Sequence, residues 1–579
     1  MPSAKIVVLT PAVLLLLALL PMWSCGGDPP GPSAPAGGVL FEDASARVGL
    51  EFEHFVGATG EYFMPEIMSG GVALLDYDLD GDLDILLTQG EALNPGAPPS
   101  FPEPEDHFPG PRLYRNDLIP GGDLRFSDAT QGSGLGPEGY GMGVAVGDYD
   151  NDGDPDVYLT RFGQNTLYRN NGDGTFARVA AHGGLDEERW SASASFFDYD
   201  LDGNLDLFWT NYVDFTVLTN KTCFDSTGAP DYCTPTVYRS VQDRLLRNEG
   251  DGRFSDVSVA AGFAAAYGNG LGSIAADFNG DSWPDIYVAN DGTDNQLWMS
   301  DGKGRFENTA LMAGAAYNAD GRPEAGMGVT AADFDGDGDE DLFMTHLAQE
   351  TNTLYLNDGG GRFRDATNRF GLGGVSLPYT GFGSRWFDYD NDGRLDLFVA
   401  NGGVTIIASQ RADPYPFRQR NQLYRGTEQG FTEVSELAGA AFELEEVGRG
   451  AAFGDVDNDG DVDVVVANNN GPARLLLNLE SSQNSWLRVR LEGAESNREG
   501  IGARVGLLRS DKEPLWRRAH RDGSYQSSSE RTLHFGLGAD AAIEGLRVIW
   551  PSGRDEVYRG IEARTVVDLK EGDGEAAVR

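Results

Sequence analysis

The sequence predicts an all-β protein in which a seven-bladed β-propeller precedes a small C-terminal β-sandwich or β-barrel domain. Two observations lead to this prediction. An aspartate loop of the form D-x-D-x-D-G-x-x-D recurs seven times along the 579 residues, with substitutions in the fourth copy, and apolar runs flank every copy. No segment shows sustained helical periodicity, and four strand-sized pieces per repeat are typical of propeller blades.

Each repeat contains four expected strands in the same order. A Gly/Ala-rich apolar run such as 71–75 precedes the aspartate loop, and a β-branched or aromatic run such as 85–87 follows it. A piece such as 167–170 (Leu-Tyr-Arg-Asn) then leads through a Gly/Asp turn to a fourth strand that starts with phenylalanine, as at Phe176. These lengths and compositions suit strands that are buried on both faces.

The two ends of the repeat array complement each other. The first phenylalanine strand, at Phe41, precedes every aspartate loop, whereas the last repeat ends near Asn478 without such a strand. We therefore expect the N-terminal strand to complete the last blade and close the ring, which removes exposed sheet edges. Insertions at 90–111, 211–239 and 404–420 interrupt the array, and binding specificity often resides in such surface loops.

The aspartate loops are predicted to bind Ca²⁺, at about seven sites. Side chains at loop positions 1, 3, 5 and 9 can converge on one point, position 7 can add a backbone carbonyl, and glycine at position 6 permits a sharp turn. Ca²⁺ accepts many oxygen ligands in irregular geometry, so this loop suits it better than Mg²⁺. A solvated acidic turn is the alternative for one copy, but seven copies at one spacing favour calcium.

The predicted ligands, loop by loop and with the fourth residue of each group contributing its carbonyl, are Asp76, Asp78, Asp80, Asp82 and Asp84; Asp148, Asp150, Asp152, Asp154 and Asp156; Asp198, Asp200, Asp202, Asn204 and Asp206; Asp277, Asn279, Asp281, Trp283 and Asp285; Asp333, Asp335, Asp337, Asp339 and Asp341; Asp388, Asp390, Asp392, Arg394 and Asp396; and Asp455, Asp457, Asp459, Asp461 and Asp463. The fourth loop has Asn279 at position 3 and Ser282 at position 6. It loses one charge and some freedom to turn, so we expect it to bind Ca²⁺ most weakly.

The composition excludes one class of partner. The chain carries 91 acidic and 44 basic residues, for a net charge of -47. Much of this acidity lies in the predicted metal loops. Binding to a nucleic-acid backbone requires the opposite sign, so we expect no nucleic-acid partner.

The N-terminus has the features of an export signal. Lys5 precedes an apolar stretch over residues 6–20, which is short for a membrane span. The following Met-Trp-Ser-Cys-Gly resembles a bacterial lipobox, which implies lipidation of Cys25, although Met22 and Trp23 depart from the usual pattern. An ordinary secretory signal is the alternative. The Pro/Gly-rich residues 28–38 suit a flexible tether.

Cysteine usage agrees with export. Cys223 and Cys233 lie close together in one insertion, and Cys25 is the third cysteine of the chain. Outside the cytoplasm such a neighbouring pair is most simply a local disulfide.

The loops and the phenylalanine strands resemble FG-GAP/VCBS repeats, the blade family of integrin α-propellers. The tail resembles the ASPIC/UnbV domain through residues 484–489, 496–504, 534–538 and 550–553. The pairing is similar to the cartilage acidic protein family and its bacterial relatives. The resemblance implies a secreted or surface calcium-binding propeller used for adhesion and protein interaction. It brings no settled activity.

The expected organisation is a signal peptide over 1–24, a lipidated cysteine and tether over 25–39, the propeller over 40–480, the ASPIC/UnbV domain over 481–572 and a disordered tail over 573–579.

The chain lacks paired zinc-binding histidines, a G-x-S-x-G elbow, a Walker loop and a Rossmann fingerprint. A polar site in the tail is conceivable, but structural roles are favoured for its members: Arg498, Arg504, His520, Arg521, Tyr525 and His534.

Two functions follow as hypotheses. The favoured one is a non-catalytic scaffold, anchored by lipid in the bacterial cell envelope (the outer membrane or cell surface) or else secreted, that binds an envelope or extracellular protein or a glycan. The alternative is an envelope hydrolase or lyase with its active site at the propeller mouth or in the C-terminal domain. The N-terminal lipid is the only expected membrane contact.

The lipid anchor can be tested at one residue. Cys25→Ser should abolish membrane association and leave a soluble exported protein, because no other segment is expected to anchor the chain. Fractionation and metabolic labelling with a fatty acid would measure this. Wild-type protein that takes up no label would contradict the prediction.

Overall fold

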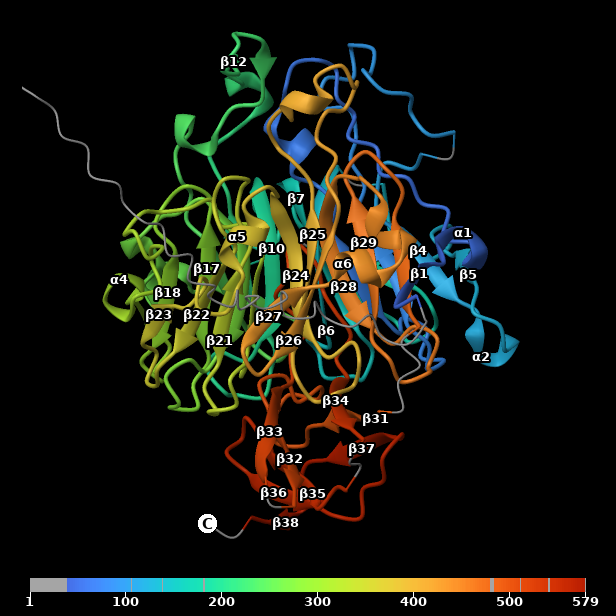
Figure 1. The fold of residues 1–579 in the computed structure, drawn as a ribbon, viewed down its shortest axis with the longest axis vertical. Coiled ribbons are helices and arrows are strands. Elements are labelled where there is room, and N and C mark those ends of the chain that lie inside the picture. Colours follow the sequence, from blue (N-terminus) through green and yellow to red (C-terminus); the bar gives the residue numbers. More distant parts are fainter. Residues whose placement is uncertain are drawn as a thin grey trace, which may run out of the picture. The chain divides into compact units, whose positions relative to one another are not determined.

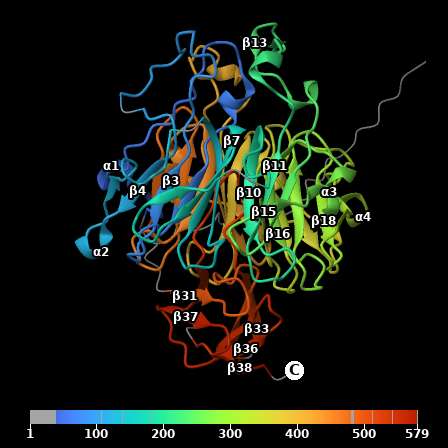
Figure 2. The same cartoon turned by 180° about the vertical axis from the view of Figure 1, so that it is seen from behind.

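The computed structural model describes residues 39–577, except residues 106, 138, 181–182, 480–483, 511 and 540–541. The predicted signal peptide, Cys25, the tether up to residue 38 and the boundary expected at 480/481 lie outside the described residues. The described part is all-β, as predicted (Figures 1 and 2). In this part no helix has the length and apolar character needed to cross a membrane.

Every repeat forms four antiparallel strands, with the aspartate loop between the first and the second. Given repeat by repeat, the strands are β2 (Val72–Leu75), β3 (Asp84–Leu87), β4 (Arg112–Asn116) and β5 (Phe126–Asp128); β6 (Tyr140–Gly147), β7 (Asp156–Gln164), β8 (Thr166–Asn170) and β9 (Phe176–Arg178); β10 (Glu188–Phe197), β11 (Asp206–Asn211), β14 (Arg244–Asn248) and β15 (Phe254–Asp256); β16 (Gly270–Ala276), β17 (Asp285–Asn290), β18 (Gln296–Ser300) and β19 (Phe306–Asn308); β20 (Val329–Ala332), β21 (Asp341–Met344), β22 (Thr353–Asn357) and β23 (Phe363–Asp365); β24 (Gly381–Phe387), β25 (Asp396–Asn401), β26 (Gln422–Thr427) and β27 (Gly430–Glu433); and β28 (Gly448–Gly454), β29 (Asp463–Asn468) and β30 (Arg474–Asn478) with β1 (Phe41–Asp43).

The N-terminal strand completes the last sheet, which confirms the expected closure. β1 pairs antiparallel with β30, and Phe41 lies opposite Asn478. The first strand of each repeat contacts that of the next, and β28 contacts β2, so these inner strands form a closed ring. β7 also pairs with β10, which joins two neighbouring repeats into one sheet. The number of blades stays a prediction, with which this pairing agrees.

Apolar side chains fill the space between neighbouring sheets. Between the first two repeats, Ala73 and Leu75 of β2 pack with Val144 and Val146 of β6. Similar clusters lie between the other sheets. Both faces of each inner sheet are therefore covered, which explains why these strands are apolar at consecutive positions and do not alternate.

The helices are single turns at strand connections. They are α1 (Ser45–Val48), α2 (Leu118–Gly121), α3 (Ser258–Ala261), α4 (Ala310–Ala313), α5 (Gly373–Ser376) and α6 (Ser435–Ala438), with the 3₁₀ turns η1 (Met64–Ile67), η2 (Val217–Thr219), η3 (Pro235–Val237), η4 (Phe263–Ala265), η5 (Ala408–Gln410) and η6 (Ala440–Glu443). The short hairpin of β12 (Cys223–Phe224) and β13 (Pro230–Asp231) belongs to the insertion at 211–239.

The C-terminal domain consists of two sheets around one apolar core, as expected for a sandwich. One sheet has the order β34 (Leu533–Gly538), β31 (Ser485–Glu492), β37 (Val566–Lys570). The other has the order β33 (Lys512–Arg518), β32 (Arg504–Arg509), β35 (Gly545–Ile549), β36 (Asp555–Tyr558), β38 (Glu575–Ala576). Both sheets contribute to the core, for example through Val489 and Phe535 from the first and Val505 and Val548 from the second.

The expected end of this domain at residue 572 is too early. Glu575 and Ala576 form β38, which pairs with β36 through Val557 and Glu556. The backbone groups at 575–576 thus complete a sheet edge, which the charged and Gly-rich sequence of this segment did not suggest. Residues 578–579 lie outside the described part.

Residues 520–531, which connect β33 to β34, fill the axis of the propeller. This axial segment forms hydrogen bonds with the innermost strand of every repeat. The bonds run from Leu74 N to Ser528 O (3.0 Å), Val144 N to Gln526 O (3.1 Å), Gln526 N to Ser193 Oγ (3.0 Å), Ala275 N to Asp522 Oδ2 (2.9 Å), Val329 N to Ser524 O (3.0 Å), Ser384 N to Ser524 Oγ (3.2 Å) and Glu530 N to Phe453 O (3.0 Å). The axis is therefore occupied by the chain itself.

An apolar cluster continues beyond the axial segment. Tyr525 is fully buried, packs edge-on against Phe382 with ring centroids 4.8 Å apart, and donates to Met68 O (2.9 Å).

The buried Arg449 donates to four carbonyl oxygens, among them Ile67 O (2.8 Å) and Gly403 O (3.0 Å). Burial lowers the pKa of Arg449 to about 10.

Tyr525→Ala should destabilise the whole propeller. Removing a fully buried ring that contacts several repeats costs about 3–5 kcal/mol, and the Met68 carbonyl loses its donor. Urea unfolding of the full chain would measure the loss. Tyr267→Ala is the control, because that ring is 55% exposed. Equal stability of the two variants would contradict a central role for the axial segment.

Candidate metal centre

Each aspartate loop begins where an inner strand ends and folds through two left-handed residues. Position 6 has positive φ in all seven loops, with Gly81 at 98° and Ser282 at 74°. Position 4 also has positive φ, for example 62° at Leu79 and 57° at Asn151. Side chains other than glycine rarely adopt this region. Ser282 nevertheless makes the same turn as the glycines, so the fourth loop keeps the backbone path of the others.

The position-1 carboxylate holds the turn together. In the first loop, Asp76 Oδ1 accepts from Asp80 N and Oδ2 accepts from Gly81 N, both at 3.1 Å. The second, third, sixth and seventh loops repeat this pair of bonds. The side chain at position 1 is thereby fixed at the centre of the loop.

The position-9 carboxylate ties the loop to the third strand. Asp84 Oδ2 accepts from Tyr77 N (3.0 Å), and its Oδ1 accepts from Asn116 N (2.8 Å). Asn116 Nδ2 then donates to Val456 O (2.8 Å), which belongs to the loop of the last repeat. Asn170, Asn248, Asn357 and Asn478 bridge to their preceding repeats in the same way. The asparagine of the Leu-Tyr-Arg-Asn piece thus links adjacent loops.

The structure brings together predicted ligand side chains. One oxygen from each of positions 1, 3 and 9 lies within 4.8 Å of the others in the first, second, third and sixth loops, and positions 1, 3 and 5 do so in the fifth. In the described residues, the buried Oδ1 atoms of Asp78, Asp150, Asp200 and Asp457 accept no hydrogen bond. Buried carboxylate oxygens without a donor are unfavourable. A bound Ca²⁺ would supply the missing positive charge, so these residues fit that ion. Binding through the position-7 carbonyls stays a prediction.

The loop carboxylates carry an electrostatic cost of burial. Burial and then Glu499 raise the pKa of Asp148 to about 7, and burial and then the neighbouring Asp202 and Asp200 raise the pKa of Asp198 to about 7. Burial raises the pKa of Asp156 to about 9 and that of Asp285 to about 8. The charged forms of these groups therefore require compensation from a cation.

The fourth loop differs at position 3, as expected. Asn279 is turned onto its own loop, where its Oδ1 accepts from Asp281 N (2.8 Å) and its Nδ2 donates to Asp281 Oδ2 (3.1 Å). Asp277 accepts from three backbone groups, including Ser282 N (2.7 Å). Fewer oxygens of this loop are left for a cation.

The C-terminal domain contacts the aspartate loops directly. Arg488 Nη1 lies 2.6 Å from Asp455 Oδ2, with both side chains nearly fully buried, and also pairs with Glu530. Glu499 Oε2 accepts from Asp148 N (3.3 Å) while Arg521 holds its other oxygen at 2.6 Å. Arg488 and Glu499 lie in tail segments that resemble the ASPIC/UnbV domain, but the sequence around them and around Glu530 did not predict these contacts, because their partners lie in distant loops.

The tail residues considered for a polar site have structural surroundings. Burial and then Arg518 and Arg385 lower the pKa of His520 to about 3. Its Nδ1 faces Asp522 Oδ1 (3.1 Å), and its Nε2 lies 3.4 Å from Arg385 Nη2. Both ring nitrogens of His520 are therefore engaged, so the ring is not available as a base.

The remaining members of that set also contact the propeller. Burial likewise lowers the pKa of His534 to about 3. Arg498 N donates to Asn151 Oδ1 (2.9 Å), and Arg504 donates to Gly338 O. Arg521 and Tyr525 have the contacts described above. The favoured structural roles thus agree with the geometry.

The insertions gather at the end of the ring opposite the C-terminal domain (Figures 1 and 2). We call the surface of residues 90–111, 211–239 and 404–420 the crown. Phe101 packs against Tyr415, with 5.2 Å between the ring centroids, and Tyr232 packs against Phe417 at 6.1 Å. Arg411 Nη1 forms an ion pair with Asp225 Oδ2 of the disulfide-bonded hairpin at 2.7 Å. The three insertions therefore form one surface.

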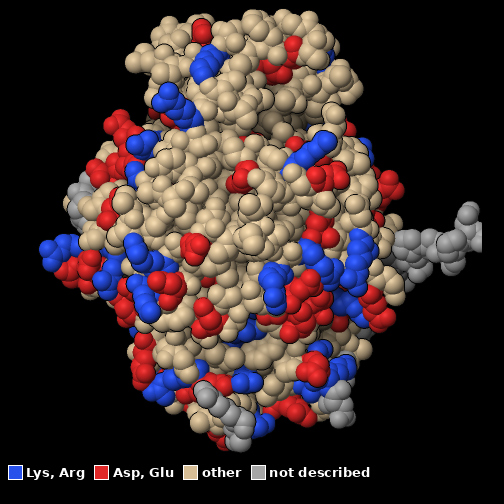
Figure 3. Space-filling view, turned by 90° about the vertical axis from the view of Figure 1, so that its left-hand side faces the viewer, with Lys and Arg blue, Asp and Glu red and all other residues tan. Residues whose placement is uncertain are grey.

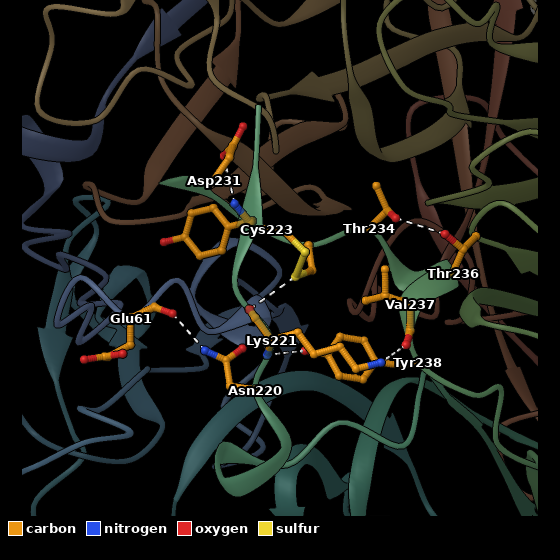
Figure 4. Close-up of a disulfide and its surroundings, with 11 residues drawn as sticks. Glu61, Asn220, Lys221, Cys223, Asp231, Thr234, Thr236, Val237 and Tyr238 are labelled. Atoms are coloured by element: carbon orange, nitrogen blue, oxygen red, sulfur yellow. Dashed lines mark hydrogen bonds between the residues drawn. A yellow bond between two sulfur atoms is a disulfide. The ribbon is translucent and has the colours of Figure 1, made fainter. Parts of the chain in front are cut away.

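The predicted disulfide is present in the crown. Cys223 and Cys233 are bonded at 2.05 Å (Figure 4). Beside the bridge, Lys221 donates to Val237 O, and Asn220 Nδ2 donates to Glu61 O (2.8 Å). The hairpin is thus fastened both within itself and to the loop before η1.

Comparison with known proteins agrees with this geometry. FG-GAP-like repeats match residues 76–159, 148–209, 224–288, 277–344 and 333–399, which together span more than half of the chain. The chain belongs to the FG-GAP-like repeat family. The ASPIC and UnbV model matches residues 493–576. These matches confirm the repeat family and the tail domain inferred from the loops and the tail motifs.

Cartilage acidic protein 1 is a relative over part of the chain. The mouse protein is 31% identical over 309 residues, which is 52% of this chain and 44% of that protein, and the human protein is also 31% identical, with 52% and 43% covered. The chain thus spans less than half the length of these curated relatives. The BP39L lectin of Burkholderia pseudomallei has a TM-score of 0.41 at 12% identity, over 72% of this chain and 97% of the lectin.

Calcium should leave the fourth loop first during chelation. Asn279→Asp adds a carboxylate, which should raise the affinity of that loop about tenfold and remove its early loss. Calorimetric calcium titration and structures at limiting calcium would measure the order in which the loops lose calcium. Asp78→Asn is the converse variant, because it removes the position-3 carboxylate from the first loop. A fourth loop that stays filled while another empties would contradict the prediction.

Proposed function

We propose that this protein is an exported, calcium-binding propeller, anchored by lipid at Cys25 in a bacterial envelope, that acts as a non-catalytic scaffold for a protein or glycan. The observation that carries the calcium part is the set of buried position-3 oxygens without donors, at Asp78, Asp150, Asp200 and Asp457. Ion binding to the folded state alone would stabilise the ring by mass action.

Two observations favour a scaffold over an enzyme. The axial segment bonds to the inner strands along the propeller axis, which leaves less room there for an active site of the rival hydrolase or lyase. His520 is neutral and engaged at both ring nitrogens. These contacts favour a site outside the axis for the alternative enzyme.

The crown is the surface we propose for partner binding. Leu218 is 98% exposed and Phe224 is 62% exposed, both in the disulfide-bonded insertion. Figure 3 views the side of the molecule that is on the left in Figure 1. On this side, few charged side chains lie at the crown and many lie towards the C-terminal domain. Exposed apolar side chains with few neighbouring charges are typical of the centre of protein interfaces.

The scaffold function can be tested with two surface variants. Leu218→Ser with Phe224→Ser should abolish capture of the envelope partner and leave thermal stability unchanged, because neither side chain is buried. Leu311→Ser with Met312→Ser, on the outer rim in α4, is the matched control and should keep partner capture.

Calcium enters the same experiment as a second variable. Chelation should lower the melting temperature of every variant and abolish capture by the wild type, since buried like charges then repel one another. An unchanged melting temperature, with no calcium found by elemental analysis, would contradict the calcium part. Turnover in a hydrolase and glycan-cleavage screen, lost on a single polar substitution that leaves folding intact, would contradict the scaffold part.

A further inference from the structure

A cleft of about 250 Å³ lies between the C-terminal domain and the third and fourth aspartate loops. The domain forms hydrogen bonds or ion pairs with the second, fifth, sixth and seventh loops, and the cleft lies beside the third and fourth. Its walls combine apolar side chains, among them Phe196 from β10 and Ile549 and Pro551 from the domain, with charged ones.

The floor of the cleft holds two charged side chains with unused hydrogen-bonding capacity. Arg518 Nε lies 3.5 Å from Glu340 Oε1, and the two side chains are 6% and 9% exposed. Among the described residues, Arg518 Nε and Nη2 have no hydrogen-bond acceptor, and Glu340 Oε2 has no donor. Both residues also line a smaller cavity of about 90 Å³. Buried groups of this kind normally have partners, so these two side chains have hydrogen-bonding capacity for a ligand or a water.

The other charged groups of the cleft already have partners. Asp198 and Asp277 accept from backbone groups of their own loops, and Arg504 donates to Gly338 O. Asp522 accepts from Ala275 N (2.9 Å) and faces His520 Nδ1 (3.1 Å). Asp555 accepts two bonds from Arg547 at 2.7 and 2.8 Å. The groups that can still form hydrogen bonds are therefore Nε and Nη2 of Arg518 and the neighbouring Oε2 of Glu340.

This combination favours a neutral ligand over an ion. The opposite charges of Arg518 and Glu340 largely cancel, so an ion of either sign meets both attraction and repulsion. A hydroxyl group both donates and accepts, so neighbouring hydroxyls can satisfy the arginine edge and the carboxylate together. The apolar part of the wall, at Phe196, Ile549 and Pro551, suits the C–H face of a sugar ring, and small-ligand sites commonly combine apolar contacts with convergent polar groups.

We propose that the interdomain cleft binds one unit of a neutral sugar through Arg518 and Glu340. This deepens the proposed scaffold function, on whose glycan branch it rests, by naming a ligand class and a place for it. The cleft is distinct from the crown, so the protein would have two binding surfaces at opposite ends of the ring.

The test uses the full chain with calcium and a panel of neutral monosaccharides, with acetate, a uronate, an amine and an amide as competing chemistries. At least one neutral sugar should bind saturably, with a Kd on the order of 1 mM. Ile549→Trp fills the cleft and should weaken binding at least about tenfold. Val566→Trp is the control, since this position on β37 is 41% exposed and lies outside the cleft.

A second variant separates binding from folding. Arg518→Lys keeps the charge but loses the planar edge, so it should weaken sugar binding while the melting temperature without sugar stays close to that of the wild type. Saturable binding of no neutral sugar, binding of an ion or the amide only, or binding that Ile549→Trp leaves unchanged would overturn the proposal. Calcium content and partner capture by the crown are measured on the same samples. If they hold while sugar binding fails, only the cleft proposal is lost.

Discussion

The structure depends on how it compensates aspartates that are buried at the start of the second strand of every repeat. The position-9 carboxylate accepts from two backbone groups, and the asparagine beside it reaches the preceding repeat, as Asn116 does at Val456. These bonds satisfy the oxygens but leave the charge, which needs a positive partner. The proposed cation in each loop would be one source, and arginines are another, as for Arg488 at Asp455. The C-terminal domain thus supplies such a partner to the seventh loop.

Much of the fold could be predicted because it repeats. The length of the repeat, the spacing within each aspartate loop and the separate phenylalanine strand at Phe41 can all be read from the sequence. Each copy of the repeat supports the interpretation of the others. The axial segment could not be predicted in this way. Residues 520–531 are polar and serine-rich, and they bind mainly main-chain groups of the inner strands, which carry no side-chain signature. Ser282 is an intermediate case, since its residue type suggested less freedom to turn than the backbone in fact has.

The two domains are more closely integrated than a propeller with an appended module. The sandwich core is its own, yet its connecting segment supplies hydrogen bonds to all inner strands, and Glu499 and Glu530 accept from the first residue of two aspartate loops. This contact surface buries charged groups that are paired across it, such as Arg521 with Glu499. Replacing the tail by an unrelated domain would leave those inner-strand groups without partners.

The pairing of Phe41 with Asn478 also constrains how the chain reaches its native state. The first strand emerges earliest during synthesis, but its partner appears only after every other repeat, and the axial segment follows later still. Contacts so distant in sequence form slowly because a long loop must close first. Until then the ring has open edges and an unfilled interior, which are the features that promote aggregation of incomplete chains. A chain of this design therefore depends on protection of its early repeats until the last residues of the C-terminal domain have been made.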